Sequence, residues 1–124
     1  MGFQEAVKKC FSNYVNFNGR ARRPEYWWFA LFMFAGNILF GILDRILFGV
    51  TADGDSIGTL GVLFSIAVLL PAIAVAVRRL HDRDMSGWWY LLVLIPLLGW
   101  LILLFFFVQK GTEGPNRFGE EPPA

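Results

Sequence analysis

Two short segments of the chain hold most of the side chains that could do chemistry. Each is rich in arginine and also carries carboxylates; one lies at 19–25 and the other at 78–84, where the only histidine is found. Guanidinium groups donate forked hydrogen bonds that match the oxygens of phosphate and carboxylate. The two segments therefore predict a site for an anionic group, such as a lipid-headgroup phosphate, or for a partner protein. The candidate residues are Arg20, Arg22, Arg23, Glu25, Arg78, Arg79, His81 and Asp82.

A second interpretation of both segments needs no ligand. Membrane proteins collect lysine and arginine on their cytoplasmic side, where this charge fixes the orientation. Here the positive charge would be partly balanced by Glu25, Asp82 and Asp84. Both interpretations are compatible with the residue pattern.

Other kinds of chemistry find little support in the sequence. A metal site needs three or more ligands, and the chain has one histidine and a single thiol, Cys10. There is no glycine-rich phosphate loop, no paired cysteine motif and no nucleophile elbow. His81 alone could act as an acid, a base or a ligand. We therefore predict no catalytic residue, no metal and no cofactor, and we expect no nucleic-acid partner.

The elements that must position these residues are apolar and free of charge. Lysine, arginine, aspartate and glutamate make up 17% of the chain, yet none occurs in three stretches, 26–43, 57–77 and 88–108. As helices these stretches would be about 27 to 31 Å long, which matches a hydrocarbon core of about 30 Å. A soluble domain of this length could not bury so much apolar surface. The pattern predicts three transmembrane helices, with Phe48 as an alternative end of the first.

The residues before the first apolar stretch predict a further helix, at 3–15. At 100° per residue its apolar side chains fall on one side and its lysines on the other. The apolar ones are Phe3, Ala6, Val7, Cys10, Phe11 and Tyr14. Such a helix lies either in the headgroup plane or against the protein's own surface. The expected fold is thus all-α, a single polytopic membrane domain over 1–124 with an N-terminal amphipathic interfacial helix and an extended tail at 109–124.

The distribution of positive charge predicts the orientation. Most lysines and arginines lie before the first stretch or between the second and third. Because the positively charged side faces the cytoplasm, we expect the N-terminus and the 78–84 segment inside. Three crossings would then leave the tail outside.

Several motifs, taken together, resemble those of a known family. They are FNGRARRPEYWWF at 17–29, RRLHDRDMSGWW at 78–89, LIPLLGW at 94–100 and GPNRFGEEP at 114–122. In this order they resemble a bacterial membrane family named domain of unknown function 805. The resemblance implies a small, multi-pass protein of the bacterial inner membrane and no known activity. It also adds tail residues to the candidates: Asn116, Arg117, Phe118 and Gly119.

The tail motif and the predicted orientation are in tension. With the tail outside, its residues cannot touch the two arginine segments of the same chain. A cytoplasmic tail, which needs one crossing more or fewer, would bring all three motifs to one face and strengthen a shared site.

The functional hypotheses follow from these elements. The first is a structural or interaction protein, or a lipid-contact module, because the spans hold no charged residue that could carry an ion pathway. The alternative is a subunit of a small oligomeric transporter or channel, since three helices enclose little space. An enzyme acting on a lipid headgroup has the least support. The expected partners are membrane lipids, including anionic ones, a second copy of the chain, or another membrane protein.

Overall fold

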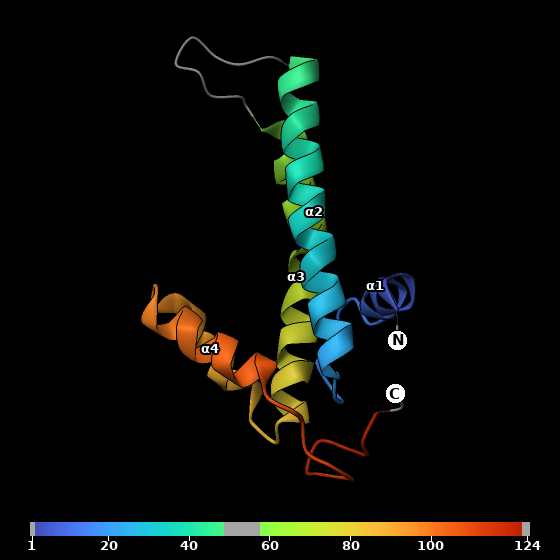
Figure 1. The fold of residues 1–124 in the computed structure, drawn as a ribbon, viewed down its shortest axis with the longest axis vertical. Coiled ribbons are helices and arrows are strands. Elements are labelled where there is room, and N and C mark those ends of the chain that lie inside the picture. Colours follow the sequence, from blue (N-terminus) through green and yellow to red (C-terminus); the bar gives the residue numbers. More distant parts are fainter. Residues whose placement is uncertain (1, 49–57, 123–124) are drawn as a thin grey trace.

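The computed structural model describes residues 2–48 and 58–122. Over these residues the protein is helical, without a β-strand, as predicted. Its elements are α1 (Phe3–Ser12), α2 (Arg23–Phe48), α3 (Thr59–Asp82), the 3-10 helix η1 (Gly87–Leu94) and α4 (Leu98–Val108) (Figure 1).

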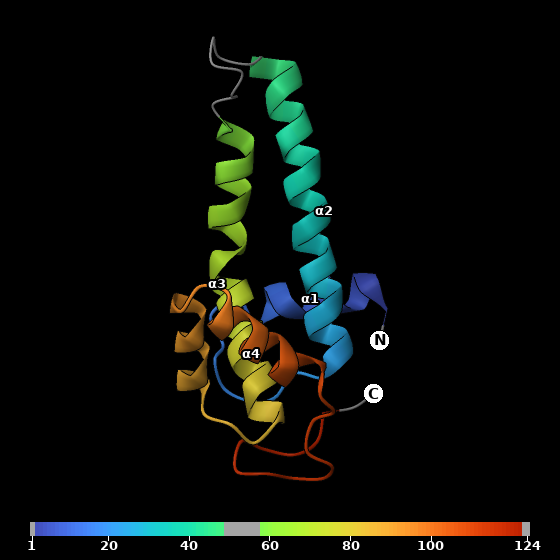
Figure 2. The same ribbon diagram turned by 60° about the vertical axis from the view of Figure 1, so that its left-hand side comes forward.

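The two long helices α2 and α3 stand side by side as a hairpin (Figure 2). Their 26 and 24 residues correspond to about 39 and 36 Å at ~1.5 Å per residue, enough to cross a hydrocarbon core of ~30 Å. Only 6% and 28% of the residues in their most apolar windows are buried inside the protein. A core helix of a soluble protein is mostly buried, so both helices are candidate membrane spans. They contain the predicted stretches 26–43 and 57–77, apart from residue 57, which lies outside the described residues, and Gly58, which precedes α3.

Close contacts hold the hairpin together along its length. Gly36 of α2 faces the ring of Phe64 on α3 so closely that a Cβ atom at Gly36 would overlap it. Farther along α2, the buried Asp44 accepts hydrogen bonds from the backbone N–H groups of Leu60 (2.7 Å) and Gly61 (2.9 Å). These are unpaired donors at the start of α3, where a carboxylate is also favoured by the helix dipole. Asp44 thus fixes the end of α2 to the beginning of α3.

The third apolar stretch is not one helix, and our prediction of a single span over 88–108 is wrong. It divides into η1 and α4, which pack against each other and against α3 near one end of the hairpin (Figures 1 and 2). Pro96 lacks the N–H that would continue a helix, and Leu97 has a φ of 64°. Gly99 then passes so near the carbonyl of Leu92 that a Cβ would overlap it. With 11 residues, α4 is too short to cross the core, so three transmembrane helices are not confirmed.

Helix α1 lies across α2 and α3 at the same end of the hairpin (Figure 2). Ala6 and Cys10 are completely buried there. The rings of Phe3 and Phe11 lie edge-on to Trp28 (5.9 Å) and Phe29 (5.6 Å). The apolar side of the amphipathic helix α1 therefore packs on the protein itself. Because Phe3 and Phe11 remain 41% and 38% exposed, a place in the headgroup plane stays a prediction.

The Gly36 contact can be tested by adding one methyl group. Gly36→Ala should destabilise the hairpin by about 1–3 kcal/mol, because the methyl group overpacks the site filled by Phe64. Gly41→Ala is the matched control. A Cβ at Gly41 meets nothing within 4 Å, so this variant should keep its stability or gain up to about 1 kcal/mol from helix propensity. Reversible unfolding in micelles with rising dodecyl sulfate measures both. Equal stabilities would contradict the close packing of α2 on α3.

Candidate functional site

A buried carboxylate joins two distant parts of the chain at the end of α3. The two oxygens of Asp82 accept hydrogen bonds from Arg20 Nε (2.9 Å) and Arg79 Nη1 (2.8 Å). The side chains of Arg20, Arg79 and Asp82 are 1%, 0% and 6% exposed. The first arginine segment and the second, both predicted as candidate sites, therefore meet in one ion-pair cluster.

The tail supplies the acceptors that this cluster lacks. Two guanidinium groups share one carboxylate, so their other N–H groups need partners. Arg20 donates to the backbone carbonyls of Thr112, Gly114 (2.7 Å) and Gly119 (3.2 Å). Arg79 donates to the carbonyls of Phe107 (3.2 Å), Gln109 and Ala21 (3.4 Å). The tail is thus held by arginine donors along most of its length.

The backbone contacts between tail and α3 are equally close. The N–H of Thr112 donates to the carbonyl of Asp82 (2.6 Å). Beside it, a Cβ at Gly111 would overlap the Asp82 carboxylate. A glycine is therefore required where the tail passes over the ion-pair cluster.

A second buried ion pair lies under α1. Glu25, which is completely buried, pairs with Arg78 and lies 3.4 Å from Lys9 Nζ. The thiol of Cys10 is 3.8 Å from the Glu25 carboxylate. Burial, helped by this carboxylate, raises the pKa of Cys10 to about 12. The thiol stays protonated at neutral pH, and a protonated thiol is a poor nucleophile.

The tail motif forms a turn over the end of α3. Asn116 and Gly119 pair through their backbones, and the Asn116 amide donates to the carbonyl of His81 (2.9 Å). The ring of Phe118 stacks flat on the His81 imidazole, with 4.0 Å between the ring centroids. The guanidinium group of Arg117 lies over the Phe118 ring and pairs with Asp84 (3.3 Å). The imidazole Nδ1 is 2.9 Å from the Gly19 carbonyl. The resemblance added these tail residues to the candidates, and the structure places them beside the second arginine segment.

These contacts overturn the expectation that the tail lies on the far side from the arginine segments. The physical reason is the turn at Pro96: the chain does not continue along the hairpin, so α4 returns residue 109 to the end where α2 begins and α3 ends (Figure 1). All three charged motifs therefore meet at one end of the hairpin.

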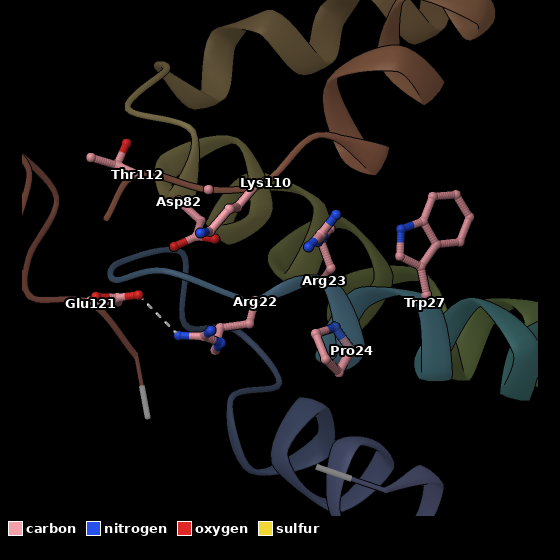
Figure 3. Close-up of a pocket in the computed structure, with 9 residues that line it drawn as sticks. Arg22, Arg23, Pro24, Trp27, Asp82, Lys110, Thr112 and Glu121 are labelled. Atoms are coloured by element: carbon pink, nitrogen blue, oxygen red, sulfur yellow. Dashed lines mark hydrogen bonds and ion pairs between the residues drawn. The ribbon is translucent and has the colours of Figure 1, made fainter. Parts of the chain in front are cut away.

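Most of the predicted site residues are buried and form ion pairs or hydrogen bonds within the protein, although Nε and Nη2 of Arg78 have no hydrogen-bond partner among the described residues. The buried residues are Arg20, Glu25, Arg78, Arg79, His81 and Asp82. Arg22 and Arg23 differ, because they line a cavity of about 360 Å³ between the start of α2 and the tail (Figure 3). Lys110 lines it too, and our sequence analysis missed it. It comes two residues after the third apolar stretch, a position we had assigned to the opposite side.

The described residues contain no group of three or more histidine, cysteine, aspartate or glutamate side chains that could hold a metal ion. The charged groups that line the cavity are guanidinium, ammonium and carboxylate groups.

The comparisons with known proteins confirm the family that the sequence motifs resembled. Residues 14–120 match the model of the family described as "Protein of unknown function (DUF805)", and the chain belongs to this family. No solved structure matches the chain.

Relatives of similar length carry names that place them in a membrane. The chain is 50% identical to the inner membrane protein YhaH of Escherichia coli K12, over 92% of this chain and 93% of that protein. It is 46% identical to the inner membrane protein YhaI of the same strain, over 89% and 88% of the two chains. A third relative, the uncharacterized protein YiiR, is 29% identical. With the two candidate spans, these names support a bacterial inner-membrane protein.

The role of Asp82 can be tested through the tail. Asp82→Asn should destabilise the fold by about 3–5 kcal/mol, because it leaves two buried guanidinium groups without their counter-charge. The tail should detach first, so trypsin should cut after Lys110 and Arg117 at least about tenfold faster. The control Glu113→Gln removes the exposed ion pair with Lys110 and should change stability by less than about 0.5 kcal/mol. A tail in the Asp82→Asn protein as resistant as in the wild type would contradict this role.

Proposed function

We propose that the chain is a non-enzymatic lipid-contact and interaction module, anchored in the inner membrane by the α2–α3 hairpin and acting at the cytoplasmic face. The observation that carries this proposal is the gathering of every charged motif at one end of an apolar hairpin. The hairpin anchors the protein in the membrane. Its folded end, which comprises α1, η1, α4 and the tail together with the adjoining ends of α2 and α3, carries the proposed function.

The charge distribution supports a cytoplasmic location of this end. With the tail beside the two arginine segments, all 11 lysines and arginines except Arg45 belong to the same side of the hairpin. Positive charge of this kind faces the cytoplasm in inner-membrane proteins. The positive charge is more strongly concentrated on one side of the membrane in this arrangement than in the predicted one with three crossings. In that prediction Lys110 and Arg117 of the tail lay outside, against the positive-inside rule.

The contacts at this end also favour interaction over catalysis. The buried carboxylates are held by arginines, and the thiol of Cys10 is protonated. A general acid or base needs to be within reach of a substrate proton. Three of the five charged residues that line the cavity, Arg22, Arg23 and Lys110, are instead cations of the kind that recognise phosphate and carboxylate groups.

Fusions at both ends test the orientation. A fluorescent protein that folds only in the cytoplasm should be bright when fused before residue 1 and also when fused after Ala124. Alkaline phosphatase, which is active only outside the cytoplasm, should be inactive at Ala124 and active when inserted after Asp53, which lies between α2 and α3 in the sequence. An active phosphatase at Ala124 would contradict the two-pass arrangement.

A second candidate, a subunit of an oligomeric transporter or channel, has one observation in its favour. Asn37 of α2 and Ser65 of α3 form a hydrogen bond (3.2 Å) within the apolar part of the hairpin, and both residues are exposed on its surface. Polar side chains at membrane depth favour contact with another helix over contact with lipid. A second copy of the chain covering this pair would satisfy that preference.

Native mass spectrometry of the wild type from a mild detergent tests this candidate. A defined oligomer that Asn37→Leu weakens by about 1 kcal/mol, and that the neighbouring Ile38→Leu leaves intact, would support it. A monomeric wild type would exclude it without affecting the lipid-contact proposal.

A further inference from the structure

We infer that the cavity between the start of α2 and the tail binds the phosphate of an anionic phospholipid headgroup. This inference rests on the proposed function, because it needs the cavity to lie at the cytoplasmic surface of the membrane. It goes further in naming the ligand and the side chains that hold it.

The cavity carries an excess of positive charge. Arg22, Arg23 and Lys110 line it (Figure 3), and its volume of about 360 Å³ lies within the ~300–1,000 Å³ of small-ligand sites. Asp82 also lines it, but both of its oxygens are occupied by Arg20 and Arg79. Among the described residues Arg23 forms no ion pair, and its Nη1 only donates to the Val108 carbonyl at 3.3 Å. Its guanidinium group is therefore the least satisfied cation of the cavity.

The tail itself shows that the cavity accepts an anion. The carboxylate of Glu121 lines the cavity and pairs with Arg22 at 3.4 Å. The two side chains are 40% and 31% exposed, so their attraction is weakened by solvent. The Gly114 N–H donates to the same carboxylate (2.9 Å) and lowers its pKa. A lipid phosphate, which carries one negative charge as the Glu121 carboxylate does, can take the place of Glu121 on Arg22.

The position of the cavity favours a lipid over a soluble anion. Trp27 lines it, with its indole N–H donating to the Phe107 carbonyl (3.3 Å). Tryptophan is enriched at the level of the headgroups. On α4, whose last residue Val108 accepts a hydrogen bond from Arg23, the side chains of Leu101, Leu104 and Phe105 are 56%, 46% and 56% exposed. Acyl chains along this apolar surface would bring the headgroup of the same lipid to the cavity.

The inference is tested by titrating dioleoyl phosphatidylglycerol into the delipidated full-length protein and counting bound lipids by native mass spectrometry. The wild type should bind one phosphatidylglycerol in preference to phosphatidylcholine. The double variant Arg23→Gln/Lys110→Gln should weaken this binding at least about tenfold, because it removes two charge-assisted contacts. Arg23→Lys, which keeps the charge and loses the fork, should weaken it less.

The matched control is Arg45→Gln/Lys8→Gln, which removes one arginine and one lysine outside the cavity. It should change the affinity by no more than about twofold, since distant exposed charges are screened. Tryptic resistance at Arg117, the tail cleavage site that every variant keeps, reports whether the fold is intact. Unchanged binding in Arg23→Gln/Lys110→Gln, or an equal loss in the control, would overturn the inference.

Two further arms identify the source of the phosphate and the role of Glu121. Millimolar inorganic phosphate should fail to displace phosphatidylglycerol, and displacement would overturn the assignment to a lipid. Glu121→Gln should tighten phosphatidylglycerol binding, because it removes the competing carboxylate; weaker binding would overturn the displacement step. If lipid binding fails while both termini report the cytoplasm, only this inference falls. A C-terminus outside would remove the proposed function itself.

Discussion

The folded end of the molecule depends on the buried carboxylate of Asp82. Its two oxygens accept hydrogen bonds from Arg20, which precedes α2, and from Arg79 of its own helix. Its backbone carbonyl accepts a hydrogen bond from the N–H of Thr112 in the tail. Removing three charged groups from water is expensive, and one carboxylate cannot satisfy two guanidinium groups. The arrangement is stable only if other acceptors complete the shell. The tail provides them as backbone carbonyls, which explains why a segment without helix or strand is held in a defined path.

The same constraint explains residues that have no chemistry of their own. Gly111 is required because any side chain there would overlap Asp82. The turn from Asn116 to Gly119, where Gly119 has a φ of 130°, directs the Gly119 carbonyl to Arg20 and sets Phe118 on His81. The tail motif thus serves the two arginine segments. Most of the residues that we predicted as an anion or partner site form contacts within the protein and hold this end of it together.

Sequence reasoning predicted the parts that depend on composition. Charge-free runs indicated α2 and α3, and helical periodicity indicated α1. It failed where geometry decides. The run at 88–108 has the composition of a span, and only the local signals Pro96 and Gly99 mark the place where the chain reverses. Without that reversal the tail was assigned to the wrong side. The density of arginine singled out both segments, but density alone could not show that Arg78 and Arg79 are buried while Arg22 and Arg23 line a cavity.

The cavity depends on the reversal of the chain at Pro96, because the reversal brings Lys110 close to Arg23. Lys110 comes two residues after the end of α4, and Arg23 opens α2. Had residues 88–108 crossed the membrane, Lys110 would lie about 30 Å from Arg23, and neither could serve the same anion. Because α4 turns back instead, Val108 comes within reach of the Arg23 guanidinium (3.3 Å) and Lys110 lines the same cavity. The apolar surface of α4 then borders the cations. A short apolar helix that ends beside the Arg23 guanidinium, which forms no ion pair among the described residues, supports the proposal of a phospholipid ligand with a charged head and apolar chains.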